Sequence, residues 1–130
     1  MTEKSIFRDK KEKGEEIKEC NLQKQYFDLI KTGKKTVEGR INSGSFQNLR
    51  VGSKIKFFEQ NDPRNFLICE VIEINSYSSF REMLESEGVE NMLPSTKSLE
   101  QGVKVYEQIP GFKKRCEKYG CLGLKIKVLE

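Results

Sequence analysis

The sequence predicts an α+β domain whose strands close into a small, partly open β-barrel. Alternating apolar and polar residues favour strands at 36–41, 54–59 and 66–75, and a further strand at 121–129 follows two helix-like segments. An order of strands, then two helices, then a strand indicates that the last strand pairs back with an early one. With 130 residues, the chain suits one domain that buries its core without disulfides or metals.

Composition narrows the chemistry that this domain can perform. The chain contains no histidine, which excludes imidazole as an acid, a base or a metal ligand. Its four cysteines include no Cys-x-x-Cys pair, and Cys69 and Cys121 stand in apolar runs typical of buried thiols. Since there is no signal peptide and no long apolar run, we expect a reducing cytoplasmic setting, no membrane contact, and neither a metal nor a cofactor.

The N-terminal segment differs from the rest in its charge. Residues 1–20 carry six Lys/Arg and six Asp/Glu with few apolar anchors, which predicts a charged, extended or partly disordered arm before a domain at 21–130. A helix is expected at 22–32, because apolar residues recur at helical spacing, Asn21 can cap its start, and Gly33 suits a left-handed helix end.

The strand after this helix separates its side chains into two faces. Thr36, Glu38 and Arg40 share one face, and the apolar face opposite should enter the core. Lys34 and Lys35 stand at the helix end, so three cations and one carboxylate lie within seven residues, close enough to share a ligand. Two other interpretations stay open: Glu38 and Arg40 brace the barrel rim as a pair, and Lys34 is simply solvated.

Two strands follow, and the second is irregular. Ile55 and Phe57 share a face of the strand at 54–59, which a turn at 61–65 ends. In the strand at 66–75, two alternating apolar patterns compete. A β-bulge, or burial of both faces, would reconcile them.

Two helices with capping boxes separate these strands from the last one. Ser79 precedes the first and Ser98 the second, and each is followed three residues later by a Glu or Gln that can bond back to the helix start. Between them, residues 88–94 form a loop with enough apolar content to pack. Residues 112–119 are interpreted as a basic connection to the last strand.

Charge alternates along the chain. Residues 31–56 carry seven Lys/Arg and one Glu, residues 57–110 carry four Lys/Arg against ten Asp/Glu, and residues 111–130 carry six against two. If the two basic segments meet in space, they form a positive surface that attracts phosphates. Solvated lysines that keep a small protein soluble explain the same pattern.

Several motifs together carry a family resemblance. The run Tyr26-Phe-Asp-Leu-Ile-Lys-Thr-Gly-Lys-Lys-Thr-Val-Glu-Gly-Arg40 resembles the signature of the ASCH domain, a relative of the PUA fold. Further matches lie at 51–57, 77–88, 93–94 and 118–126, so that the resemblance covers 21–130. It implies a small PUA-like β-barrel with helices covering one end, and a cleft associated with RNA or modified nucleosides.

The resemblance also implies candidate catalytic residues. Some bacterial ASCH proteins deacetylate N4-acetylcytidine without a metal, using a Lys, a Thr nucleophile and a Glu from the helical insertion. By resemblance, Lys35 matches the lysine and Glu90 the acid, whereas Glu38 stands where the hydrolytic relatives have Thr. A carboxylate does not replace a hydroxyl nucleophile in that chemistry, and Thr36 lies two residues out of register.

Two functions therefore remain open. We favour an RNA- or nucleotide-binding ASCH module with a basic cleft, in which cations contact phosphates or base edges and Glu38 accepts from a base amine. The residues expected to bind are the polar strand face and two tyrosines that could stack on a base: Lys34, Lys35, Thr36, Glu38, Arg40, Tyr77 and Tyr119. The alternative is a metal-independent amidohydrolase acting on N4-acetylcytidine-type nucleosides, with Lys35 as base, Glu90 as proton donor and Glu38 activating water.

Overall fold

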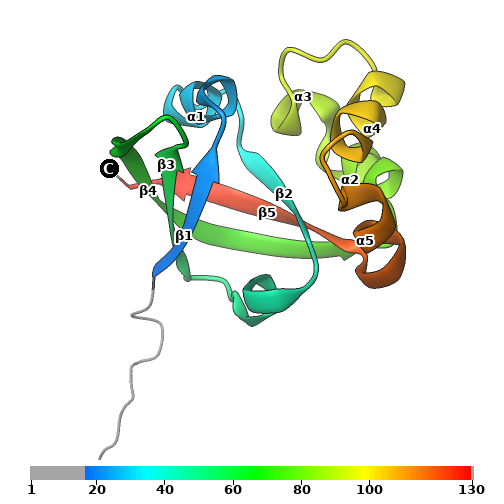
Figure 1. Ribbon diagram of the computed structural model, residues 1–130, viewed down its shortest axis with the longest axis horizontal. Helices are drawn as coiled ribbons and strands as arrows, with labels where there is room; N and C mark the ends of the chain where they lie inside the picture. The colour runs from blue at the N-terminus through cyan, green and yellow to red at the C-terminus, as the bar shows by residue number, and fades with distance from the viewer. Residues whose placement is uncertain (1–16, 130) are drawn as a thin grey trace, which may run out of the picture.

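The computed structural model describes residues 17–129, which form a five-stranded half-barrel flanked by helices (Figure 1). The strands are β1 (Ile17–Leu22), β2 (Val37–Ile41), β3 (Lys54–Glu59), β4 (Asp62–Tyr77) and β5 (Cys121–Val128), in the sheet order β1-β3-β4-β5-β2. β1 and β3 are parallel, and the other neighbours are antiparallel. The last strand thus pairs with the early strand β2, and the expected α+β, partly open barrel is confirmed.

Most of the helices lie in one insertion between β4 and β5. α1 (Lys24–Lys31) joins β1 to β2, and a 3-10 helix, η2 (Gly44–Asn48), follows β2. The insertion contains α2 (Phe80–Glu87), α3 (Val89–Met92), α4 (Leu99–Glu107) and α5 (Phe112–Tyr119), which gather beside one end of the sheet in Figure 1. Between residues 17 and 129, no helix is long and apolar enough to cross a membrane.

The predicted helix boundaries agree with the structure at three points. Ser79 accepts a hydrogen bond from the backbone N–H of Glu82, and Ser98 accepts one from that of Gln101, so each serine caps its helix. After α1, Gly33 has a φ of 81°, the left-handed conformation that glycine adopts at low cost. Local capping chemistry therefore fixes where these helices begin or end.

Two predicted boundaries near the N-terminus are wrong. Residues 17–20, expected in an arm, belong to β1, because Cys20 and Leu22 alternate into the core while their backbone pairs with β3. Asn21 lies in β1 and is not a helix cap, since α1 begins after Gln23. The rest of the expected arm, residues 1–16, lies outside the described residues, and the division of the chain into an arm and one domain stays a prediction.

Two segments of the insertion are more helical than the sequence indicated. Residues 112–119 form α5 and not an irregular connection, because Phe112 and Cys116 lie one turn apart and pack on the helical core. The loop expected at 88–94 contains the short α3, and its Met92 and Leu93 are buried as anticipated. The high lysine content of α5 obscured its apolar face.

The irregular strand contains the β-bulge that the sequence suggested. The pairing of β4 with β5 shifts register between Val71 and Glu73, which leaves Ile72 43% exposed. Cys69 and Val71 face the core before the shift, and Ile74 packs against the core after it. One extra residue therefore reconciles the two competing apolar patterns. β4 is also longer than expected, because it begins at Asp62, inside the predicted turn.

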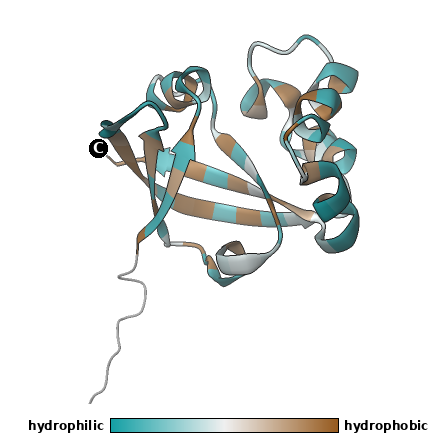
Figure 2. Cartoon of the chain, in the orientation of Figure 1, coloured by the Kyte–Doolittle hydropathy of each residue, from teal (hydrophilic) through white to brown (hydrophobic). Residues whose placement is uncertain are grey.

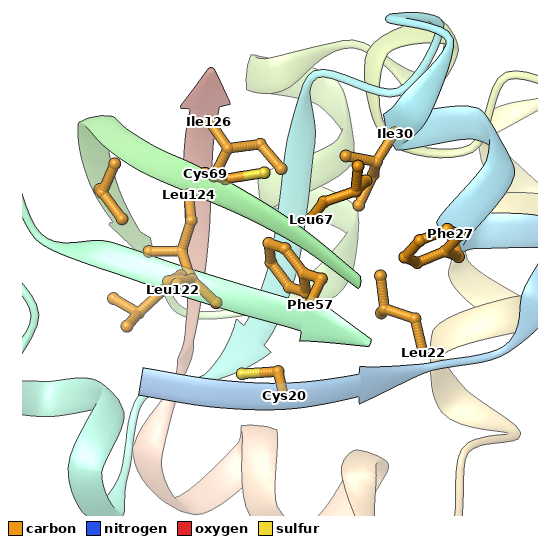
Figure 3. Packing of buried hydrophobic residues seen from close by; sticks show 12 residues of the cluster. Cys20, Leu22, Phe27, Ile30, Phe57, Leu67, Cys69, Leu122, Leu124 and Ile126 are labelled. Carbon is orange, nitrogen blue, oxygen red and sulfur yellow. The ribbon is translucent and has the colours of Figure 1, made fainter. Parts of the chain in front are cut away.

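Two apolar clusters hold the fold together. One fills the half-barrel, where side chains from β1, β3, β4, β5 and α1 point toward one another (Figure 3). The second joins α2, α3, α4 and α5 to β2 and to the start of β5. Figure 2 shows the alternation of apolar and polar residues along the strands that supplies the first cluster. A cavity opens where the two clusters meet, between β1, β2 and the end of α4.

Candidate functional site

The candidate site is a cavity of about 540 Å³, within the size range of small-molecule sites. β1, β2, the β3–β4 turn and the segment from α4 to α5 all contribute to its walls. Its polar lining comprises Asn21, Gln23, Tyr26, Lys35, Glu38, Arg40, Gln60, Tyr106 and Gln108. Apolar side chains, among them Leu22, Leu93 and Phe112, line the remainder.

Lys35 is buried in the cavity wall, with only 3% of its surface exposed. Its Nζ donates to the backbone carbonyls of Val37 at 2.8 Å and Met92 at 2.7 Å, and it lies 3.2 Å from Glu38 Oε1. These three acceptors match the three N–H donors of an ammonium group. Burial lowers the pKa of Lys35, and Glu38 opposes that change. Repulsion from Arg40 lowers the pKa of Lys35 as well, but less strongly than burial does.

Glu38 joins two cations across the face of β2. Its Oε1 faces Lys35, and its Oε2 accepts a hydrogen bond from Arg40 Nε at 2.8 Å. Burial alone would raise the pKa of this carboxyl, yet Lys35 and Arg40 together hold it below its usual value. The Glu38–Arg40 pair that the sequence left open is therefore formed, and it extends to Lys35 as a buried chain of three charges.

Among the three charged residues, Arg40 has hydrogen-bond donors that bond to no other residue between 17 and 129. Its guanidinium carbon lies 5.4 Å from the centre of the Phe46 ring, and 20% of its side chain is exposed. Its Nε bonds to Glu38, whereas neither Nη atom has a hydrogen-bond partner between residues 17 and 129. Arg40 can therefore present its two terminal NH2 groups, which carry four N–H donors, to a ligand.

The other predicted site residues lie away from the cavity. Lys34 is exposed, and Thr36 bonds through its backbone to Asn91 and Ile126. Tyr77 donates its hydroxyl to Glu87 Oε2 at 2.6 Å. Two further predicted residues, Tyr119 and Glu90, are exposed on α5 and α3 and are outside the lining. Of the expected residues, the structure brings together Lys35, Glu38 and Arg40.

Several polar residues of the cavity were not predicted as site residues. Tyr26 and Tyr106 stood in the sequence as apolar positions of expected helices, and Gln60 stood between the strand expected at 54–59 and the turn expected at 61–65. Gln23 and Gln108 stand just before α1 and just after α4. Loops and the ends of helices and strands carry most binding groups. A polar or aromatic residue at such an end is therefore a weak signal in the sequence for a binding position.

The two basic segments of the sequence meet in space. β2 pairs with β5, and Arg115 of α5 donates to the Ser43 hydroxyl at 2.8 Å. Within the cavity lining, however, the charged residues are Lys35, Arg40 and Glu38, which largely neutralise one another. Among residues 17–129, no cluster of three His, Cys, Asp or Glu side chains is arranged to hold a metal ion.

Two solved structures are similar to nearly the whole chain. The hypothetical protein PH0355 is 42% identical with a TM-score of 0.78, and the match covers 88% of this chain and 100% of that one. Protein PF0455 from Pyrococcus furiosus is 37% identical with a TM-score of 0.72, over 88% of this chain and 99% of that one.

A more distant solved structure and a family model also match the chain. An ASCH protein from Zymomonas mobilis shares the fold, with a TM-score of 0.58 at 14% identity, over 85% of this chain and 66% of that one. No curated protein was found to match the chain. The family model of the ASCH domain matches residues 21–126, which include every strand except the start of β1 and the end of β5. The chain therefore belongs to the ASCH domain family.

Proposed function

We propose that the protein binds RNA, or a free nucleoside, by taking a single base into the cavity beside Lys35, Glu38 and Arg40. Membership of the ASCH domain family supports a nucleic-acid ligand. The observation that carries the proposal is a cavity of about 540 Å³ in which Lys35, Glu38 and Arg40 are paired with one another beside aromatic rings and amide groups.

The charges favour a base in the cavity over a phosphate. Lys35 uses all three donors inside the protein, and both oxygens of Glu38 face cations. Only the Arg40 Nη groups remain for a ligand among the charged residues of this lining. A phosphate brings a full negative charge and needs several free donors, whereas a base edge needs few and gains from a dry, shaped site.

The neutral lining suits the two surfaces of a base. Tyr26 and Phe112 contribute aromatic rings, on which bases stack without dependence on sequence. The amides of Gln23 and Gln60 offer both donors and acceptors, as hydrogen bonding to a base edge requires. In this arrangement the sugar and phosphates stay outside the cavity.

Fluorescence anisotropy with labelled single-stranded RNA tests the proposal through two matched variants. Arg40→Lys keeps a positive charge beside Glu38 but removes both Nη groups, so the affinity should fall about tenfold. Lys34→Met removes an exposed charge outside the cavity and should change the affinity less than twofold at moderate salt. Binding that depends on Lys34 and not on Arg40 would place the RNA on the surface and overturn the proposal, as would no binding at low salt.

An amidohydrolase acting on N-acylated cytidine is the second candidate, and one observation favours it. The Lys35 amine lines the cavity, and burial lowers its pKa toward the range of a general base. Glu90 is exposed and outside the cavity lining, which leaves Glu38 as the cavity carboxylate that would activate water. Incubation with N4-acetylcytidine, followed by chromatography for cytidine, tests the activity. Turnover that is unchanged in Glu38→Gln would remove the assigned role.

A further inference from the structure

Tyr106 carries a buried polar group that has no partner among the residues the structure describes. Its side chain lines the cavity from α4 and is only 4% exposed, so its hydroxyl is removed from bulk water. The hydroxyl forms no hydrogen bond with any residue between 17 and 129. Leaving a buried donor unpaired is costly, so folded proteins rarely do so without a functional reason.

The position of this hydroxyl is fixed by packing. The Tyr106 ring stacks on Phe80 with centroids 5.3 Å apart, and Phe80 stacks in turn on Phe112 at 6.2 Å. This row of three rings prevents Tyr106 from turning away to reach water elsewhere. The hydroxyl is therefore held in place before any ligand arrives.

β2 is shaped to accommodate the hydroxyl. A β-carbon on Gly39 would lie 2.8 Å from Tyr106 Oη, closer than real contacts allow. The absence of a side chain at Gly39 lets the hydroxyl approach the strand between Glu38 and Arg40. Because neither Nη atom of Arg40 has a partner between residues 17 and 129, donors from both β2 and α4 line this one cavity.

We propose that the Tyr106 hydroxyl is a specificity-determining donor that, together with the Arg40 guanidinium, binds an exocyclic carbonyl oxygen of the base. This inference rests on the proposed function. The charged acceptor Glu38 is occupied on both oxygens, so the strongest free groups of the cavity are donors. Uracil, cytosine and guanine carry an exocyclic carbonyl, which can accept hydrogen bonds from these donors. Adenine carries an exocyclic amine, which is itself a donor and cannot accept from them. The site should therefore discriminate against adenine.

The Tyr106→Phe variant isolates the hydroxyl, because it keeps the ring and its stack on Phe80. Labelled oligouridylate and oligoadenylate of equal length are the probes. We expect the wild-type protein to bind oligouridylate about tenfold more tightly, and Tyr106→Phe to lose about tenfold for oligouridylate and less than twofold for oligoadenylate. The unfolding midpoint of the ligand-free variant should be unchanged or higher, because the substitution removes an unpaired buried donor.

The outcomes separate this inference from the proposed function. If Tyr106→Phe binds oligouridylate like the wild type, or if the wild type prefers oligoadenylate, the role of Tyr106 is overturned while RNA binding stands. A lower unfolding midpoint in the ligand-free variant would show that the hydroxyl has a structural partner and would also overturn the role. If the wild type binds neither RNA, the proposed function fails, and this inference fails with it.

Discussion

The two walls of the cavity use polar groups in different ways. On the β2 wall, Lys35, Glu38 and Arg40 are bonded mainly to one another and to backbone carbonyls. On the helical wall, the Tyr106 hydroxyl has no partner among the described residues, although it is nearly as buried as Lys35. Paired groups stabilise the fold, whereas an unpaired group in a cavity is available to a ligand.

This difference predicts different consequences of substitution on the two walls. A buried ion pair contributes little net stability compared with an apolar pair, but removing one member leaves an uncompensated charge. Changes on the β2 wall should therefore reduce the free energy of unfolding. Changes to the unpaired groups should reduce ligand affinity and leave stability nearly intact.

The largest effect is expected for Lys35→Met. The substitution leaves the carbonyls of Val37 and Met92 without a donor and Glu38 with one cation in place of two. The free energy of unfolding should fall by about 3–5 kcal/mol, measured by urea denaturation. Lys34→Met is the matched control: its side chain is exposed, and the change should stay within about 0.5 kcal/mol. Equal effects at the two positions would show that the buried charge chain is not a structural element.

The second prediction concerns the pH dependence that Glu38 confers. Its pKa is lower in the folded protein than in the unfolded chain, so its contribution to stability is complete above the unfolded value of about 4.3. That contribution is lost as the pH falls toward the folded pKa. Glu38→Gln should therefore be less stable than the wild type at neutral pH, on the order of 3 kcal/mol, with a difference that shrinks below about pH 4.

Urea denaturation of both proteins between neutral and acidic pH measures this difference. Glu90→Gln serves as the control, because Glu90 is exposed and outside the cavity. It should follow the wild type at every pH. A difference between the wild type and Glu38→Gln that does not change with pH would contradict the assigned ionisation of Glu38.

Gly39→Ala tests the contact between the two walls. The new methyl group would lie 2.8 Å from Tyr106 Oη and 3.0 Å from Met83 Cε, so the helical wall must shift. Overpacking of this kind should lower the free energy of unfolding by about 1–3 kcal/mol. In the double variant with Tyr106→Phe, the nearest atom is absent, and part of the loss should be recovered. Strictly additive effects of the two substitutions would mean that Tyr106 and Gly39 do not meet.

Local signals in the sequence were sufficient for much of the fold. Ser79 and Ser98 mark their helices because capping acts within four residues, and alternation in β3 identifies its buried face. The misassigned segments have mixed signals. In β1, Lys18 and Glu19 stand directly before Cys20, and in α5 lysines surround a narrow apolar face. Their structure depends on pairing and packing with distant elements, which one sequence does not reveal.

The same distinction divides the candidate site. Lys35, Glu38 and Arg40 were predictable as a group because they are neighbours along one segment. The burial of Lys35 was not, since it depends on the Met92 carbonyl, 57 residues away in the sequence. In the sequence, Tyr106 looks like any aromatic residue on a helix face. Its place against Gly39 of β2, in the wall of the cavity, is visible only in the structure.

The smallest effect is expected for Tyr77→Phe, which separates a paired tyrosine from the unpaired Tyr106. The Tyr77 hydroxyl donates to Glu87 Oε2 at 2.6 Å and is outside the cavity. Its removal should lower the free energy of unfolding by roughly 1–2 kcal/mol and leave RNA affinity unchanged. Tyr106→Phe should show the opposite pattern. Urea denaturation and anisotropy on the same two variants measure both quantities, and a tenfold loss of RNA affinity in Tyr77→Phe would return Tyr77 to the binding site predicted from the sequence.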